Sequence, residues 1–358
     1  MCARSANSGS LGAGRKLVFA GVLLFVFFGA VEIAARVLES RSAPAEVLPE
    51  PIPNACAERQ DCVPGAVSLP ALPPDAIPMV EEHRAGWGFV PGSVVNHGNV
   101  LIKINSLGLR GREPSGDKAP DELRLLSLGD STVYGFGVRE TSIFGNVAAN
   151  GMSESLGRPV VHFNAALPGY SSTQAQLVLD DIGEVVRPDW IIVACIWSDL
   201  FHAAHAPDAR ERVPLASYRA LVRLLGPWLP PRRIGWWDPE LGVGTPGEGR
   251  SPRTTLAEYM NNLHRLAATA TGLGARTVFV ALPAPIDLDP DQVPAYISDY
   301  RAAMFTVAEK NGAPFVNGPE YFLQHGATGA MFYDQVHPSI EGHRLLGEAV
   351  ASALVEEQ

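Results

Sequence analysis

The chain has 358 residues, of which 46% are hydrophobic and 18% are charged, and its formal net charge is -10 at pH 7. This balance is typical of a globular protein with one large domain or two small ones. An acidic chain is not expected to bind nucleic acid, whose recognition needs a surplus of positive charge.

The first notable element is an uncharged apolar run, LVFAGVLLFVFFGAV, which begins at Leu17 and resumes after Glu32 as far as Ala35. A helix needs about 17 to 25 mostly apolar residues to span a bilayer. The stretch from Leu17 to Ala35 is therefore just long enough, provided that Glu32 lies near an interface.

Basic residues precede this run, namely Arg4, Arg15 and Lys16. Since positive charge favours the cytoplasmic side, we expect residues 1–38 to be a cytoplasmic tip and an uncleaved signal-anchor. The rest of the chain would then lie in the periplasm or at the cell surface. A cleaved signal peptide and a buried helix are the alternatives, although Ala34-Ala35-Arg36 is a poor cleavage site.

A region rich in proline and alanine follows at residues 39–80 and predicts an extended linker. Cys56 and Cys62 lie in it. They predict a small-loop disulfide in an oxidising compartment, and two free thiols are the alternative. Cys195 lies in an apolar strand sequence and is expected in the core.

Residues 81–120 predict a small β cover segment. The runs WGFVPG (87–92) and VLIKIN (100–105) suggest a hairpin with glycine-rich turns. The sequence NSLGLRG (105–111) then leads toward the next element, a serine turn.

From residue 121 onward, short apolar strands alternate with helices. We expect strands at 123–128, 159–163, 189–196, 276–282 and 314–316, and helices at 141–156, 172–186, 254–272, 294–311 and 340–355. Continuously apolar strands are typical of a parallel sheet buried on both faces. Residues 121–358 thus predict an α/β, doubly wound, flavodoxin-like five-stranded sheet with helices on both faces, whose working site lies at the carboxyl ends of the strands.

Residues 200–253 interrupt this alternation with many proline, tryptophan and glycine residues. The segment is too long for a plain connection and predicts a cap or a substrate-side loop. Trp236 and Trp237 in it suggest either a hydrophobic anchor for the cap or a platform for sugar stacking.

Gly129-Asp130-Ser131 follows the first strand of the sheet. Ser131 is a candidate nucleophile, because such a turn lifts the hydroxyl off the sheet edge and brings backbone N–H groups near a developing oxyanion. A serine hydroxyl needs a base within hydrogen-bond reach. His337 is the best candidate base, and Asp334, three residues earlier, has a spacing that suits a bond to its Nδ1–H. The alternative for this Asp-x-x-His sequence is a surface loop before a helix.

An oxyanion needs hydrogen-bond donors, and three candidates follow successive strands. The first is the N–H of Ser131 itself. The second is Gly169, which follows the second strand and for which a simple strand-to-helix turn is the alternative. The third is Ser198, in Trp197-Ser198-Asp199 after the third strand.

These runs resemble the SGNH/GDSL hydrolases, whose four sequence blocks occur here in order over residues 122 to 355. The resemblance implies that Ser131, Asp334 and His337 form a catalytic triad, and that Gly169 contributes an amide to the oxyanion hole. The family usually has Gly-x-Asn-Asp in its third block, so Ser198 replaces the expected asparagine donor. The membrane segment and residues 105–111 also look like membrane-anchored members of the family, which often act on acyl groups of cell-surface polysaccharides.

Three functions follow from this resemblance. The first is a membrane-anchored, extracytoplasmic serine esterase that removes a small acyl group, which we expect to be acetyl, from a glycan or similar ester, without a cofactor or metal. The second is an O-acyltransferase with the same triad. The third is a non-catalytic glycan-binding module, which the replacement at Ser198 motivates. No protein partner follows from the sequence.

Several other polar or aromatic residues have less specific interpretations. His202 and His205 lack a third metal ligand and suggest a cap loop, while His343 is expected on a helix face. Asp130 and Asp199 are expected to order their own loops. Trp197 suggests either core packing, a narrowed acyl pocket or a sugar-stacking ring.

Overall fold

The structure is a computed structural model that describes residues 27–31, 33–34, 79–83, 85–97, 100–114, 118–200 and 252–358. The chain divides into two compact units, one of residues 1–48 with 212–232 and one of residues 49–211 with 233–358. In the first unit, residues 27–31 and 33–34 are helical. Among the described residues, no helix has the length and apolar character needed to cross a membrane.

Several predicted features lie outside the described residues. These are the basic tip of the N-terminus, the linker with Cys56 and Cys62, and residues 201–251 with His202, His205, Trp236 and Trp237.

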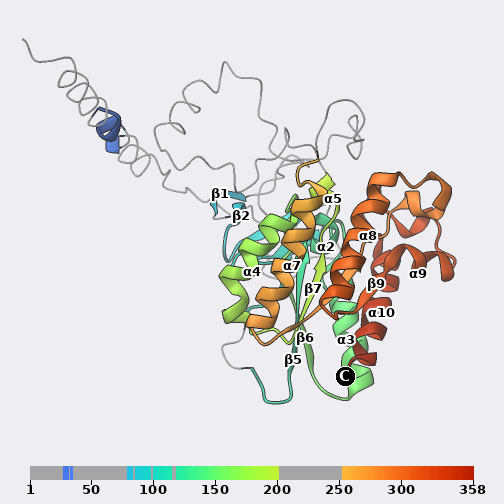
Figure 1. Ribbon diagram of the computed structural model, residues 1–358. Coiled ribbons are helices and arrows are strands. Elements are labelled where there is room, and N and C mark those ends of the chain that lie inside the picture. Colours follow the sequence, from blue (N-terminus) through green and yellow to red (C-terminus); the bar gives the residue numbers. More distant parts are fainter. Residues whose placement is uncertain are drawn as a thin grey trace, which may run out of the picture. The chain divides into compact units, whose positions relative to one another are not determined.

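A five-stranded parallel sheet forms the centre of the second unit (Figure 1). Its strands are β5 (Leu123–Gly129), β6 (Val160–Asn164), β7 (Trp190–Ala194), β8 (Arg276–Ala281) and β9 (Phe315–Asn317). They lie in the order β6-β5-β7-β8-β9, and each neighbouring pair is parallel. This is the flavodoxin-like order, with the first strand of the sheet next to the second and the third. The prediction of an α/β fold with a parallel sheet is confirmed.

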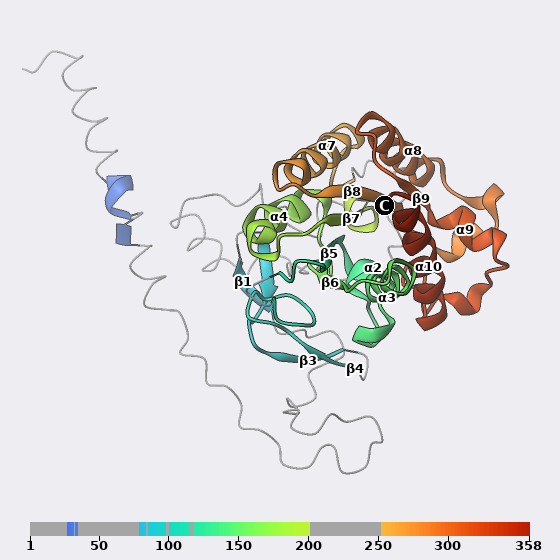
Figure 2. The same cartoon turned by 90° about the horizontal axis from the view of Figure 1, so that it is seen from below.

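Helices cover both faces of this sheet. Figure 2 shows α4 (Ser172–Val186), α7 (Leu256–Gly272) and α8 (Ala295–Lys310) on one face, with α3 (Phe144–Leu156) and α10 (Ile340–Glu356) on the other. Shorter helices are α2 (Ser131–Tyr134), α5 (Trp197–Leu200), α9 (Gly318–Gln324), η1 (Glu140–Ser142), η4 (Pro285–Leu288), η5 (Pro290–Gln292) and η6 (Gly329–Met331). Because α2 and α5 each follow a strand directly, they lie at the carboxyl edge of the sheet, where doubly wound folds place their sites.

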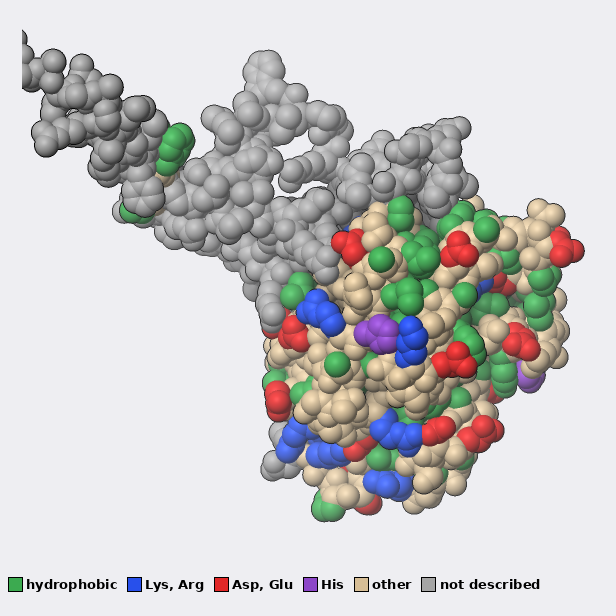
Figure 3. Space-filling view, viewed as in Figure 1, with side chains coloured by type: hydrophobic (Ala, Val, Ile, Leu, Met, Phe, Trp, Pro, Cys, Tyr) green, Lys and Arg blue, Asp and Glu red, His purple; other side chains and the backbone are tan. Residues whose placement is uncertain are grey.

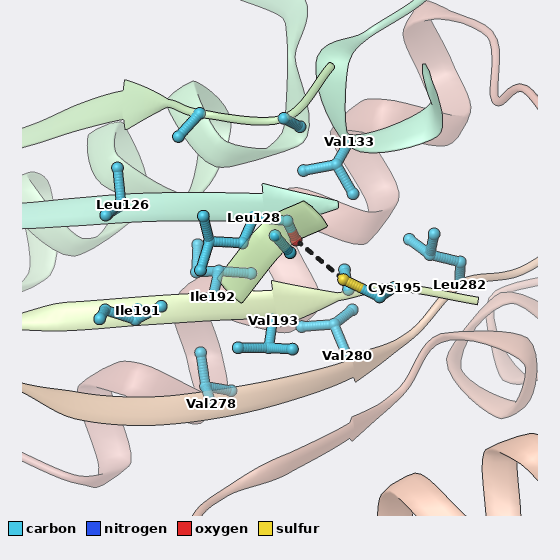
Figure 4. Packing of buried hydrophobic residues seen from close by; sticks show 14 of the residues in the cluster. Leu126, Leu128, Val133, Ile191, Ile192, Val193, Cys195, Val278, Val280 and Leu282 are labelled. Carbon is cyan, nitrogen blue, oxygen red and sulfur yellow. Dashed lines mark hydrogen bonds between the residues drawn. The ribbon is translucent and has the colours of Figure 1, made fainter. Parts of the chain in front are cut away.

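The core consists of aliphatic side chains on the central strands, shown close up in Figure 4. Leu126, Ile192 and Val278 are fully buried, and burial of such a side chain contributes about 1.5–3 kcal/mol. Cys195 is also fully buried, and its thiol lies 3.9 Å from the Leu128 carbonyl oxygen, so it is a core residue as predicted.

The surface over α4, α7 and α8 differs between its two ends (Figure 3). Acidic and basic side chains are interspersed toward the amino ends of the strands, and hydrophobic side chains are more frequent toward the carboxyl ends.

The N-terminal β segment forms two hairpins. β1 (Met79–His83) pairs with β2 (Gly86–Phe89), and β3 (Val94–His97) pairs with β4 (Val100–Lys103). The predicted pairing of 87–92 with 100–105 is therefore wrong. Each of those runs pairs with the strand beside it in sequence, because closing a short loop costs less conformational entropy than closing a longer one. The predicted linker extends to residue 80, whereas β1 already begins at Met79.

We predict that Gly129→Ala lowers the free energy of unfolding by about 1–3 kcal/mol, the usual cost of overpacking. A Cβ atom on Gly129 would lie 2.4 Å from Cγ2 of Val133 and 2.7 Å from the Ala194 carbonyl oxygen. Gly272→Ala is the control, since a Cβ there meets no atom within 4 Å and alanine favours helix by up to about 1 kcal/mol. Urea denaturation measures both variants, and equal midpoints for the two would contradict the prediction.

Candidate active site

Ser131 is the first residue of α2, directly after β5. Asp130 caps this helix, because its Oδ1 accepts a hydrogen bond from the Thr132 N–H at 3.0 Å. Gly135, with a φ of +84°, ends the helix after a single turn, and its N–H donates to the Ser131 carbonyl. The Ser131 side chain is half-buried at this sharp turn.

A chain of hydrogen bonds joins Ser131, His337 and Asp334. Nε2 of His337 lies 2.7 Å from Oγ of Ser131, and Nδ1 of the same ring lies 2.6 Å from Oδ2 of Asp334. The other oxygen of Asp334 accepts the N–H groups of Val336 and His337, each at 2.9 Å. The imidazole therefore has one nitrogen directed at a hydroxyl and the other at a carboxylate, the arrangement needed to remove a serine proton.

Contacts to the serine turn hold the histidine loop in place. The Thr132 hydroxyl donates to the Val336 carbonyl at 3.1 Å. The Phe136 ring stacks on the His337 ring, with centroids 4.6 Å apart and an interplanar angle of 22°. Since Thr132 and Phe136 both follow Ser131 closely, one turn of chain positions both the hydroxyl and the imidazole.

The environment of Asp334 favours its ionised form. Burial alone would raise its pKa, but the hydrogen bond and charge of His337 and the two backbone N–H groups outweigh that effect, so the pKa is lowered. Asp334 is thus a carboxylate at neutral pH, as required to stabilise an imidazolium.

Two backbone N–H groups near the serine turn are free to bind an oxyanion. In the described part of the chain, neither the Ser131 N–H nor the Gly169 N–H donates to another group. Gly169 lies in the turn between β6 and α4, with a φ of +80° and half-buried. Because β5 and β6 are adjacent and parallel, both N–H groups lie at the same edge of the sheet.

Ser198 lies in α5, at the carboxyl end of β7. Its backbone N–H donates to Oδ2 of Asp130 at 3.3 Å, while its hydroxyl makes no hydrogen bond to any described residue. Its role as an oxyanion donor stays a prediction. The neighbouring Trp197 is only 1% exposed, which supports core packing and leaves no open ring face for a sugar.

The two buried acids both order loops, but only Asp130 acts on its own turn as predicted, whereas the Asp199 side chain binds a different segment. Asp130 joins the serine turn to α5 by accepting the N–H groups of Trp197 and Ser198. Asp199 accepts both the N–H and the hydroxyl of Ser172, the latter at 2.6 Å, and thereby holds the start of α4.

Of the remaining histidines, His343 is fully buried in α10, where its Nδ1 accepts the Phe144 N–H at 3.3 Å. The part of the chain that the structure describes contains no cluster of metal-ligating side chains.

Sequence analysis missed Arg110. This buried guanidinium donates to the carbonyls of Tyr134, Gly135 and Val138 at 3.0, 2.7 and 2.5 Å, and its Nε pairs with Glu140 at 3.0 Å. It therefore gives a further donor to carbonyl groups at the end of α2 and in the turn after it, where Asn164 and the Val138 N–H also donate to Tyr134 and Gly135. The sequence feature that could have pointed to Arg110 is the run NSLGLRG (105–111). Nothing in that run, however, indicates which carbonyls the arginine contacts.

Burial raises the pKa of Asp130 to about 6, although its N–H donors and the charge of His337 act in the opposite direction. Between pH 3.8 and 6 the folded chain holds a proton that the unfolded chain releases. The stability contributed by this group is thus fully present below pH 3.8 and is lost as the pH rises through about 6.

We therefore predict that the difference in free energy of unfolding between wild type and Asp130→Asn shrinks by roughly 2–3 kcal/mol from pH 4 to pH 7. Urea denaturation across this range measures it, and Asp121→Asn, which makes the same substitution at an exposed site, is the control. A difference that grows with pH would show instead that the buried carboxyl ionises more readily than in the unfolded chain.

Residues 127–345 match the model of the GDSL-like lipase/acylhydrolase family. The match extends from the strand before Ser131 to the helix after His337. No match is found among curated proteins.

Among solved structures, LAE5, an alpha/beta hydrolase enzyme from the metagenome of Lake Arreo in Spain, is 17% identical, with a TM-score of 0.45 over 64% of this chain and 94% of its own. A lipase/acylhydrolase from Enterococcus faecalis is 15% identical, with a TM-score of 0.41 over 66% and 96%. Axe2, an acetylxylan esterase from Geobacillus stearothermophilus, is 16% identical, with a TM-score of 0.43 over 65% and 94%.

Proposed function

Because the chain belongs to the GDSL-like lipase/acylhydrolase family and is a serine ester hydrolase, we propose that Ser131, His337 and Asp334 are its catalytic triad. The observation that carries this proposal is the continuous pair of hydrogen bonds, 2.7 Å from serine to imidazole and 2.6 Å from imidazole to carboxylate.

In the first half of the reaction, Oγ of Ser131 attacks the ester carbonyl while Nε2 of His337 takes the serine proton. His337 then returns this proton to the alkoxide leaving group, and the acyl group stays on Ser131. In the second half, His337 takes a proton from water, and the resulting hydroxide attacks the acyl-enzyme. The acid is released and Ser131 regains its proton. Asp334 stabilises the imidazolium in both halves without being protonated.

The N–H groups of Ser131 and Gly169 would stabilise the negative charge on the oxygen of the tetrahedral intermediate. Both are free in the described residues and lie at the ends of adjacent strands. Such a donor contributes about 2.7–4 kcal/mol to the stability of the transition state.

We propose a small acyl group, acetyl, as the part of the substrate bound beside Ser131. The support is the resemblance to members of the family that act on acyl groups of cell-surface polysaccharides. The alcohol part is proposed to be a glycan or a similar ester, on the resemblance of the apolar N-terminal run and of residues 105–111 to membrane-anchored members of the family.

The proposed location is extracytoplasmic, with the chain anchored once in the membrane by residues 17–35. The support is the length of this apolar run and the basic residues before it. Membrane fractionation tests this: the full chain should stay with membranes after carbonate washing and be released by detergent, and a chain lacking residues 1–38 should be released without it.

Product analysis tests the reaction. Incubation with an acetyl ester should release free acetate, and a fluorophosphonate probe should label Ser131. The same incubation with a glycan acceptor distinguishes the acyltransferase, because transfer would move the acetyl group to the acceptor. Acetyl glycan as the sole product would contradict hydrolysis, and an unlabelled Ser131 in an active enzyme would contradict the triad.

A further inference from the structure

Pro168, the residue before the second oxyanion candidate Gly169, is contacted by a residue that lies outside the family-matched range of 127–345. Trp87 is on β2, in the first N-terminal hairpin, and is 6% exposed. Its indole N–H donates to the carbonyl oxygen of Pro168 at 3.1 Å. The bond joins residues 81 positions apart in the sequence.

The acceptor of this bond belongs to the same peptide unit as the Gly169 N–H. The described chain has no cis peptide, and in a planar trans peptide the C=O and the N–H point in opposite directions. Trp87 holds the Pro168 carbonyl oxygen toward its indole ring. The Gly169 N–H of the same peptide unit therefore points away from that ring.

The peptide between Pro168 and Gly169 is the central peptide of a β-turn, and β-turns occur in type I and type II forms. Tyr170 donates its N–H to the Leu167 carbonyl at 3.1 Å, with Pro168 and Gly169 as the two central residues. Proline followed by a residue at a φ of +80° is the type II form. In the type I form the third residue has a φ near -90° and the central peptide is turned over, so the Gly169 N–H would point away from its present direction.

Neighbouring contacts hold the hairpin against this turn. The Tyr170 hydroxyl donates to the Trp87 carbonyl, and the two rings meet edge to face at 5.5 Å. Arg253 donates to the Gly169 carbonyl at 2.6 Å. These bonds fix the hairpin and the next peptide unit, but the indole N–H is the described donor to the Pro168 carbonyl.

We infer that Trp87 is a positioning residue: its indole N–H keeps the turn at residues 167–170 in the type II form and so aims the Gly169 N–H at the oxyanion. This inference rests on the proposed function of Ser131 and Gly169. It makes the N-terminal hairpin part of the catalytic apparatus of this chain.

The test is Trp87→Phe, which keeps an aromatic ring and removes the donor. We expect kcat for an acetyl ester to fall by about ten- to a hundredfold, somewhat less than the loss of a whole oxyanion donor, with KM changed by less than about threefold, because the defect is in the transition state. Thr271→Val is the control. It removes the hydrogen bond that the Thr271 hydroxyl donates to the Ala267 carbonyl at 3.0 Å near the end of α7 and leaves the contacts of the turn at residues 167–170 in place, so kcat should stay within about threefold of wild type.

A second comparison separates positioning from general damage. Gly169→Ala also disfavours the type II form, because alanine is strained at a φ of +80°. If both changes act through the Gly169 N–H, Trp87→Phe should lower kcat by less than about twofold in the Gly169→Ala background. If Trp87→Phe does not fold, a benzothienyl analogue of tryptophan at position 87 replaces the N–H by sulfur in a ring of nearly the same shape.

Wild-type kcat in a folded Trp87→Phe or benzothienyl protein would overturn the inference, as would full additivity with Gly169→Ala. Failure of the proposed function has a different signature. In that case Ser131→Ala would retain activity, whereas failure of the inference alone leaves Ser131 essential.

Discussion

Ser131→Ala is expected to lower kcat for an acetyl ester by about 10⁴- to 10⁶-fold, as for other serine nucleophiles that act with a histidine. The hydroxyl is the only group that the structure places within reach of Nε2 of His337 among the described residues. Without it, water must attack the ester directly, with only the oxyanion donors left to assist. Steady-state kinetics with a chromogenic acetyl ester measures the loss.

The fold should tolerate this change. The Ser131 side chain is half-buried and makes no hydrogen bond to the described chain other than that to His337, so the midpoint of thermal unfolding should stay nearly unchanged. Ser153→Ala is the matched control, because Ser153 lies at the far end of α3, where its hydroxyl donates to the Arg158 carbonyl. It should keep full activity. A Ser131→Ala protein that retains more than about one hundredth of wild-type kcat would rule out this serine as the nucleophile.

The second large effect is expected from Asp334→Asn, with a loss of about 10³- to 10⁴-fold in kcat. Asparagine can direct an NH₂ group at Nδ1 of His337, where the carboxylate oxygen lies at 2.6 Å. The ring then favours the tautomer with its proton on Nε2, and this nitrogen is unable to accept the proton of Ser131. The overall geometry need not change.

The loss should hold across pH 5–8, because the lowered pKa of Asp334 keeps the wild-type carboxyl ionised over that range. Asp121→Asn removes the same charge from an exposed site before β5 and should leave kcat unchanged. If Asp334→Asn were as active as this control at every pH, His337 would need no carboxylate, and the Asp-x-x-His sequence would be a plain loop.

The sequence predicts the sheet well because its strands are short and continuously apolar, so composition alone reveals them. It also indicates the pairing of Ser131 with His337, although 206 positions separate them. Parallel strands bring their carboxyl ends to one edge, and a serine base has few candidates in this chain. The resemblance to a known family adds the order of the four blocks.

The parts that sequence analysis missed depend on contacts without a periodic pattern. Trp87 and Arg110 both act on backbone carbonyls, and an acceptor of that kind is present at every residue. Their partners are set by how the two hairpins pack against the sheet. Tyr134 illustrates this, because it stacks on Phe89 at 5.4 Å and also lies 5.0 Å beneath the Arg110 guanidinium.

The place of His337 just before α10 has a consequence for biosynthesis. During translation, β5 and the serine turn emerge long before the histidine loop, and domains begin to fold as their residues appear. Helix α10 packs beside α3, on the face of the sheet shown in Figure 2. The step that covers this face therefore also brings His337, the proposed general base, to Ser131, the proposed nucleophile. A nascent chain that stops short of this loop has a serine without a base, so esterase activity would arise only when the domain is complete.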